Sequence, residues 1–211
     1  AVILCRPHNP AATIVRRAPL LAFLDTLGQD PPLVLLDEAY RDFCDDPEYP
    51  DGVALLARYP RLVILRTFSK IAGLAGMRLG YAIAPRGLLQ RMRPYSTGSI
   101  NAIVKWGGVA ALKDTEAQER VKRVTTELRS KTTAELNARG YTTIPSDANF
   151  FMVHLRRPVQ PVVEEFRKKG VIVGRPFPPM TEHLRVSIGT PEEMGRFMTA
   201  FKEVFPTAVG G

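Results

Sequence analysis

The residues from Thr67 to Arg78 combine side chains that together could hold an anionic ligand and react with an aldehyde. Two hydroxyl side chains, Thr67 and Ser69, come just before Lys70, and Arg78 follows eight residues after that lysine. Hydroxyl and guanidinium groups bind phosphate well, and a lysine amine near apolar groups and another cation becomes a usable nucleophile. Each residue alone is typical of an exposed loop, but their combination directly after an apolar run favours a ligand site.

A second candidate group begins at Asp37, which ends the apolar run 33–36 and is followed three residues later by Tyr40. Ligands of α/β sheets bind at the carboxyl ends of the strands. A carboxylate there can hold a proton on a heterocyclic nitrogen, and the tyrosine hydroxyl can reach the same ligand. Acidic residues at strand ends also cap helices or bind metals, so this pattern alone leaves its role open.

The net charge of +8 does not by itself identify a partner. Basic residues come as scattered pairs such as Arg16-Arg17 and Lys168-Lys169, without interleaved aromatic residues, so we expect no nucleic-acid site. A positive surface also concentrates small anionic ligands.

The composition, 45% hydrophobic over 211 residues, is that of a globular protein with a real core. The sequence has no long uninterrupted apolar run and no signal peptide at its start, so we expect a soluble, cytoplasmic protein with no membrane partner. The two cysteines, Cys5 and Cys44, suit thiols in a reducing compartment, and we expect neither a disulfide framework nor a metal site.

Short apolar runs alternate with helical stretches, which predicts an α/β fold. We expect strands at 1–5, 33–36, 62–65 and 79–84, buried on both faces, and a helix at 18–27. Long helices are expected at 101–113 and 116–139, the second ended by Gly140.

The remainder reads as a smaller α+β unit. We expect strands at 149–155, 171–173 and 184–188, helices at 159–169 and 191–205, and a frayed tail from 206 to 211. The predicted organisation is a partial large domain over 1–115, a connecting helix over 116–140 and a small C-terminal domain over 141–211.

Four motifs occur in an order and spacing that resemble the fold-type-I aminotransferases that use pyridoxal 5'-phosphate (PLP), and are most similar to histidinol-phosphate aminotransferases. They are His8-Asn9-Pro10, Asp37-Glu38-Ala39-Tyr40, Thr67-Phe68-Ser69-Lys70 with Gly73 and Arg78, and the segment 184–190. Segments 146–150 and 170–173 also look like this branch, so the resemblance covers essentially the whole chain. It implies a partial PLP-transferase-like large domain with a mainly parallel, mixed sheet, plus a small α+β domain.

The resemblance also implies roles for the motif residues. Lys70 would bind the cofactor aldehyde covalently and later move a proton, and Asp37 would pair with the pyridinium nitrogen. Asn9 and Tyr40 would hydrogen-bond the hydroxyl oxygen of the ring. Catalytic roles thus fall to Lys70, Asp37 and Tyr40.

The other residues of the implied site bind anionic groups. The cofactor phosphate would be held by Thr67, Ser69 and Arg78. Arg185 would form a bidentate pair with the substrate carboxylate, and Asn149 would support that arginine. Arg175 could reach a second anionic group such as a phosphate, although a basic residue at a strand end also suits a solvated surface.

Two departures from the family pattern bear on these expectations. Ala11-Ala12 follows Pro10 where the family usually has Thr-Gly, so the turn is expected to adopt a backbone compatible with alanine. Family members also have a long region before the Asn-Pro motif, including a glycine-rich turn that holds the phosphate. We therefore expect this chain to be either the second part of a longer catalytic chain or a truncated descendant.

The function implied is transfer of an amino group between an amino acid or amino-alcohol phosphate, with histidinol phosphate as the best match, and a 2-oxo acid such as 2-oxoglutarate. The resemblance implies a homodimer. Two alternatives stay open: decarboxylation of a phosphorylated amino acid, and a non-catalytic remnant that binds PLP or a partner chain.

Overall fold

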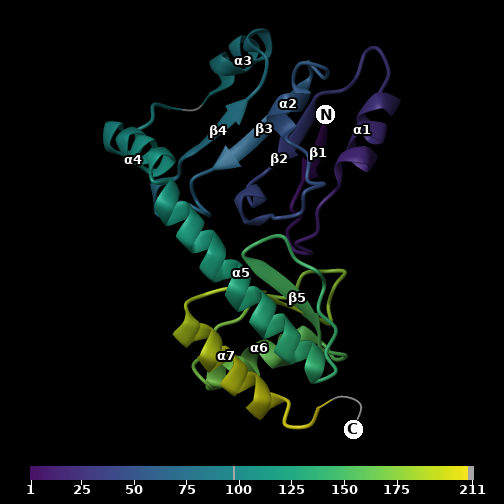
Figure 1. The fold of residues 1–211 in the computed structure, drawn as a ribbon, viewed down its shortest axis with the longest axis vertical. Coiled ribbons are helices and arrows are strands. Elements are labelled where there is room, and N and C mark those ends of the chain that lie inside the picture. Colours follow the sequence, from purple (N-terminus) through teal and green to yellow (C-terminus); the bar gives the residue numbers. More distant parts are fainter. Residues whose placement is uncertain (97, 209–211) are drawn as a thin grey trace. The chain divides into compact units, whose positions relative to one another are not determined.

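The computed structural model describes residues 1–96 and 98–208, so the last three residues of the expected frayed tail lie outside it (Figure 1). The chain divides into two compact units. Unit 1 comprises residues 1–7 and 14–121, and unit 2 comprises residues 8–13 and those from 122 onward. No helix in the described ranges combines the length and apolar character needed to cross a membrane.

Unit 1 contains a four-stranded sheet with the order β1-β2-β3-β4 (Figure 1). Its strands are β1 (Val2–Cys5), β2 (Val34–Asp37), β3 (Leu62–Thr67) and β4 (Gly80–Ile83). The first three pair in parallel, and β4 runs antiparallel to β3. This mixed, mostly parallel sheet confirms the predicted α/β fold class.

Alternate side chains of β2 and β3 pack on helix α1 (Arg17–Thr26) and the short helix α2 (Gly52–Leu55). Helices α3 (Arg86–Met92) and α4 (Ala102–Lys113) follow the sheet in sequence. Short 3₁₀ turns lie at 41–43, 75–77 and 93–95. The buried residues of this core are Leu20, Leu24, Val34, Leu36, Leu55, Leu62 and Ile64.

The expectation that every strand is buried on both faces is wrong for β1. Ile3, on the face opposite to α1, is 69% exposed. The edge strand has a helical layer over one face, and a side chain that points to the other face meets solvent.

A buried ion pair joins the carboxyl ends of β2 and β3. Glu38, only 1% exposed, follows β2 directly, and its backbone N–H donates to the carbonyl of Leu65 in β3. Nε and Nη2 of Arg66 each lie 2.9 Å from Oε2 of Glu38, and Nε of Arg41 lies 3.4 Å from the same oxygen. The pair therefore fixes the strand ends that carry Asp37 and Thr67.

The other carboxylate oxygen of Glu38 is buried next to Gly52. A Cβ added at Gly52 would lie 2.5 Å from Oε1, so a larger residue there would displace the carboxylate. Burial raises the pKa of Glu38, while the charges of Arg66 and Arg41 oppose that rise. Removing either partner would leave the other charge in a poorly hydrated place.

Unit 2 is built around the antiparallel strands β5 (Phe150–His154) and β6 (His183–Ser187). Helices α6 (Val159–Lys168) and α7 (Pro191–Val204) and most of α5 (Thr115–Ala138) complete it. Pro191 stands at the first turn of α7 as expected, and Thr190 and Glu193 form a capping box there.

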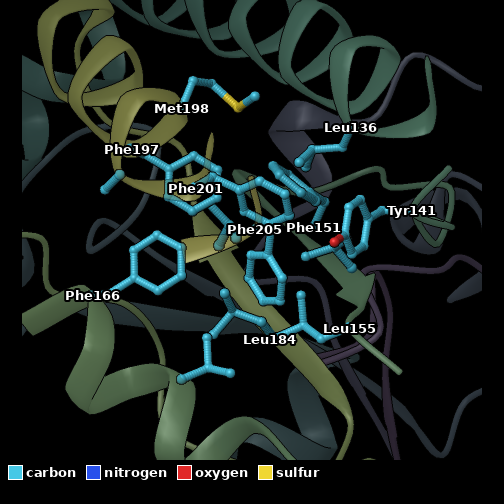
Figure 2. Close-up of a cluster of buried hydrophobic side chains, with 14 of the residues drawn as sticks. Leu136, Tyr141, Phe151, Leu155, Phe166, Leu184, Phe197, Met198, Phe201 and Phe205 are labelled. Carbon is cyan, nitrogen blue, oxygen red and sulfur yellow. The ribbon is translucent and has the colours of Figure 1, made fainter. Parts of the chain in front are cut away.

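Aromatic side chains dominate the core of unit 2 (Figure 2). Phe201 is fully buried, and its ring centre lies 5.0 Å from that of Tyr141 and 4.7 Å from that of Phe205. Phe166 stacks on Phe197 at 5.6 Å. Edge and stacked contacts of this kind add to the stability gained from burial of the rings.

The predicted strand at 171–173 is wrong. The N–H of Gly174 donates to the carbonyl of Arg185 at 3.2 Å, but residues 171–173 belong to no strand of the described structure. A pocket of about 590 Å³ is lined both by residues 170–174 and by residues 185–189. The segment therefore diverges from β6 after one hydrogen bond, and a continuous ladder cannot form.

His154 and His183 face each other across the β5–β6 pair, with ring centres 4.6 Å apart and planes 18° apart. Oε2 of Glu182 lies 3.2 Å from Nε2 of His154. Burial lowers the pKa of His183, the neighbouring His154 lowers it further, and Glu182 opposes both. Protonation of His183 is therefore less favourable in the folded chain than in the unfolded chain.

We expect Glu38→Ala to lower the free energy of unfolding by about 3 kcal/mol or more, because Arg66 would keep a largely buried charge without its partner. Arg16→Ala is the control, since Arg16 pairs with Asp46 at 3.2 Å but is 65% exposed and should contribute less than about 1 kcal/mol. Urea unfolding of the three chains measures both values, and equal small losses would contradict the role of Glu38.

A pKa that is lower in the folded state makes stability rise with pH between the folded and the unfolded value. We therefore expect the free energy of unfolding to fall as the pH drops below about 6.5, the ordinary histidine value, through protonation of His183 in the unfolded chain. His183→Phe keeps an aromatic ring against His154 and should show a smaller decrease. Urea titrations over this pH range test it, and identical pH dependence in both chains would exclude the contribution.

Candidate functional site

Lys70 lies in a tight loop directly after β3. The N–H of Gly73 donates to the carbonyl of Lys70 at 2.9 Å, and Gly73 has a left-handed φ of 68° that only glycine adopts without strain. The N–H of Leu74 then returns to the carbonyl of Phe68. The loop holds Nζ of Lys70 5.2 Å from the centre of the Tyr40 ring, so the structure brings these two predicted site residues together.

The two hydroxyl residues before Lys70 belong to the same loop. Oγ1 of Thr67 accepts a hydrogen bond from the N–H of Ser69 at 3.0 Å and donates to the carbonyl of Leu79 at 3.4 Å. This arrangement fixes the chain between the end of β3 and the lysine. A hydroxyl in such a turn is held in place before any ligand arrives.

Asp37 is the last residue of β2, and the sheet register places it beside Leu65 of β3 and Cys5 of β1. Its Oδ1 accepts a hydrogen bond from the N–H of Ala39 at 3.0 Å, which orients the half-buried carboxylate. The carboxylate of Asp37 and the loop of Lys70 thus leave from neighbouring strand ends, the usual place for ligands in an α/β sheet.

Arg78 ends the 3₁₀ turn at 75–77. It is exposed, has a left-handed φ of 54°, and donates from Nη1 to the carbonyl of Ala75 at 2.7 Å. Within the described ranges its guanidinium makes no hydrogen bond with Thr67 or Ser69. One of its N–H groups is therefore bonded within its own turn.

Asn9 and Arg185 meet within unit 2, although they are far apart in sequence. Nη1 of Arg185 donates to Oδ1 of Asn9 at 2.9 Å. Asn9 lies in a turn closed by a hydrogen bond from the N–H of His8 to the carbonyl of Thr13.

The turn that carries Asn9 does not adopt the alanine-compatible backbone that its sequence led us to expect. Ala12 has a φ of 63°, in the left-handed region that favours glycine, and its side chain is fully buried. The N–H of Asp147 donates to the carbonyl of Ala12 at 2.9 Å, so the surrounding chain holds this conformation. The turn therefore has a left-handed residue although that residue is an alanine.

The guanidinium of Arg185 also lies over two aromatic rings. Its Cζ is 5.1 Å from the centre of Phe150 and 4.8 Å from the centre of Phe177. The other predicted anion-binding arginine, Arg175, lies over the same Phe177 ring at 4.4 Å. Asn149 lies just before β5, and its Oδ1 is buried with no hydrogen-bond partner in the described part of the chain.

Sequence reasoning did not assign the pairing of Glu38 with Arg66 or the contacts of Phe177. Glu38 stands inside a recognised motif, but its partner is 28 residues away and becomes visible only through the register of β2 and β3. Phe177 sits in the Pro-rich segment 176–179, which carries no periodic signal.

The side chains of unit 1 fit a phosphorylated heterocycle that bears an aldehyde. The loop after β3 offers an amine and two hydroxyls, and the end of β2 offers an oriented carboxylate. An amine suits the aldehyde, hydroxyls suit the phosphate, and the carboxylate suits a protonated ring nitrogen.

The chain is similar in sequence to known proteins of one family. The model of the family "Aminotransferase class I and II" matches residues 1–201. A histidinol-phosphate aminotransferase of Symbiobacterium thermophilum is 40% identical over 206 residues, covering 95% of this chain and 55% of that protein. An aromatic amino acid aminotransferase of Streptomyces avermitilis is 38% identical, covering 93% and 54%.

Solved structures agree with the fold. The histidinol-phosphate aminotransferase of Sinorhizobium meliloti in complex with pyridoxal 5'-phosphate superposes with a TM-score of 0.88 at 26% identity, covering 97% of this chain and 57% of that one. The L-threonine-O-3-phosphate decarboxylase of Porphyromonas gingivalis has a TM-score of 0.81 at 20% identity, covering 97% and 64%, and shares the fold alone. The chain spans about half the length of the curated relatives that it matches. It belongs to the class I and II aminotransferases, a family of PLP-dependent transferases.

Proposed function

We propose that this chain supplies the cofactor lysine and the substrate arginine of an aminotransferase that moves an amino group between histidinol phosphate and a 2-oxo acid such as 2-oxoglutarate. The observation that carries the proposal is the placement of Lys70, with its amine 5.2 Å from the Tyr40 ring, on the loop that follows β3 next to the strand ending at Asp37. Relatives at 37–40% identity named histidinol-phosphate aminotransferases support the choice of donor.

PLP, when bound, supplies a ring that accepts electrons from the substrate. The carboxylate of Asp37 would hold a proton at the ring nitrogen, which would make the ring a better electron acceptor. Tyr40 and Asn9 would donate to the oxygen of the ring hydroxyl. Thr67, Ser69 and Arg78 would bind the phosphate through hydroxyl and guanidinium groups.

Lys70 has two tasks in this proposal. Its amine would hold the cofactor through the aldehyde, and as a free base it would move a proton between two carbon atoms. Arg185 would bind a carboxylate of the 2-oxo acid substrate through its N–H groups, with Asn9 accepting one of its other hydrogen bonds. The family resemblance leads us to propose a homodimer for the whole protein.

A second candidate donor is an aromatic amino acid. The aminotransferase of Streptomyces avermitilis, which is named for such substrates, is 38% identical to this chain. Decarboxylation of a phosphorylated amino acid has weaker support, because the decarboxylase comparison is one of fold at 20% identity.

We expect reduction with borohydride in the presence of PLP to fix a pyridoxyl group on Lys70 of the purified chain. Peptide mass spectrometry should find this label at Lys70 and only trace amounts at the exposed Lys113 and Lys168. Lys70→Arg preserves the charge and should lose the selective label. Equal labelling of all lysines would mean that this chain does not form the cofactor site by itself, as a non-catalytic remnant would behave.

We expect Asp37→Asn to weaken PLP binding by at least about tenfold, because a hydrogen bond between two charged groups contributes roughly 1.5–3 kcal/mol. Equilibrium dialysis of the chain with PLP measures the change. Asp30→Asn is the matched control, since the Asp30 side chain is 96% exposed and pairs only with Arg61 at the surface. Unchanged affinity in Asp37→Asn would remove this residue from the cofactor site.

A further inference from the structure

Phe177 links the two arginines that were expected to bind anions. Cζ of Arg185 lies 4.8 Å from the ring centre of Phe177, and Cζ of Arg175 lies 4.4 Å from it. Arg185 also lies over Phe150 at 5.1 Å. All four residues belong to unit 2, so they form one continuous set of cation–π contacts within a single compact body.

Two like charges near one ring repel each other unless something offsets the repulsion. The negative face of an aromatic ring attracts both guanidiniums, at about 0.5–2 kcal/mol each. Arg175 is exposed, and its side chain donates to the carbonyl of its neighbour Pro176 at 3.2 Å. The Phe177 ring is the contact that Arg175 shares with Arg185.

The backbone keeps Phe177 in place. The N–H of Met180 donates to the carbonyl of Phe177 at 2.7 Å, which closes the turn over residues 177–180. The N–H of Gly174 donates to the carbonyl of Arg185, and a Cβ at Gly174 would lie 2.7 Å from that oxygen. Glycine at this position thus brings the chain that carries Arg175 and Phe177 against β6.

Stacking on a ring uses the face of a guanidinium and leaves its N–H edge for ligands. Because both guanidinium carbons lie within 4.8 Å of one ring centre, the two arginines are close enough for one small molecule to reach both. A ligand with an anionic group at each end can form a bidentate pair with each arginine, whereas a ligand with one carboxylate can form only one such pair.

We propose that Phe177 is a positioning residue that fixes Arg175 relative to Arg185 and so determines a preference for substrates with two anionic groups. This inference rests on the proposed function for the identity of the substrate, and it favours a dicarboxylic 2-oxo acid such as 2-oxoglutarate over an aromatic 2-oxo acid. The uncharged ring affects ligand binding only by positioning the two arginines.

The proposal is tested by titrating the 211-residue chain with glutarate and with butyrate. NMR of the arginine Nε–H signals records the binding. Glutarate should bind more tightly than butyrate. Phe177→Leu, which keeps apolar volume but removes the ring, should weaken glutarate about tenfold and butyrate much less. Phe177→Tyr restores an aromatic face and should restore glutarate affinity. Only in Phe177→Leu should the Nε–H signal of Arg175 lose its ring-current shift and that of Arg185, which also lies over Phe150, decrease.

A double-mutant cycle separates positioning from general packing. Arg175→Ala alone should weaken glutarate about as much as Phe177→Leu, and the double variant should lose about tenfold rather than a hundredfold, because both changes remove the same contact. Arg157→Ala is the control: it also removes one charge and one guanidinium–ring contact in unit 2, at Phe205, and should leave glutarate binding unchanged.

Three results would overturn the proposal: no preference for glutarate over butyrate in the unaltered chain, a full hundredfold loss in the double variant, or equal affinity in Phe177→Leu and the unaltered chain. None of these measurements uses PLP or turnover. If Lys70 is labelled selectively but glutarate is not preferred, this inference alone is rejected. If glutarate is preferred but Lys70 is not labelled selectively, the cofactor assignment alone is rejected.

Discussion

The ion pair between Glu38 and Arg66 is the interaction on which the candidate cofactor site depends. It lies where two parallel strands end, and each partner is next to a site residue: Glu38 follows Asp37, and Arg66 precedes Thr67. Desolvation makes such a pair costly, so it contributes less to net stability than to the placement of the two strand ends. Gly52 leaves the room that the buried carboxylate needs.

Unit 2 handles charge in a different way. Arg175 and Arg185 lie over aromatic rings, and Arg185 also donates to the amide oxygen of Asn9. A guanidinium whose face lies on a ring can still present N–H groups to an anionic ligand. The aromatic core of α6 and α7 gives β6 a rigid base for this arrangement.

Much of this could be predicted from the sequence, because the relevant signals are local. The runs of apolar residues around 33–36 and 62–65 became β2 and β3, and Pro191 marked the start of α7. The motif residues Lys70 and Tyr40 were expected together and are together. The strand expected at 171–173 is absent from the described structure, and its apolar residues gave no sign of this, since they line a pocket together with residues of β6.

Contacts between distant segments were beyond sequence reasoning. Phe177 gains its role from Arg185, which lies across a turn, and Ala12 keeps a left-handed backbone because buried surroundings hold it there. Neither feature is indicated by the composition of the sequence or by the spacing of its residues.

The most direct test of the central claim is a crystal structure of the chain after reduction with borohydride in the presence of PLP. Continuous density from Nζ of Lys70 into the pyridoxyl ring, with the carboxylate of Asp37 at the ring nitrogen, is the expected result. A pyridoxyl group on another lysine, or a ring nitrogen that faces away from Asp37, would contradict the assignment of the ends of β2 and β3 as the cofactor site.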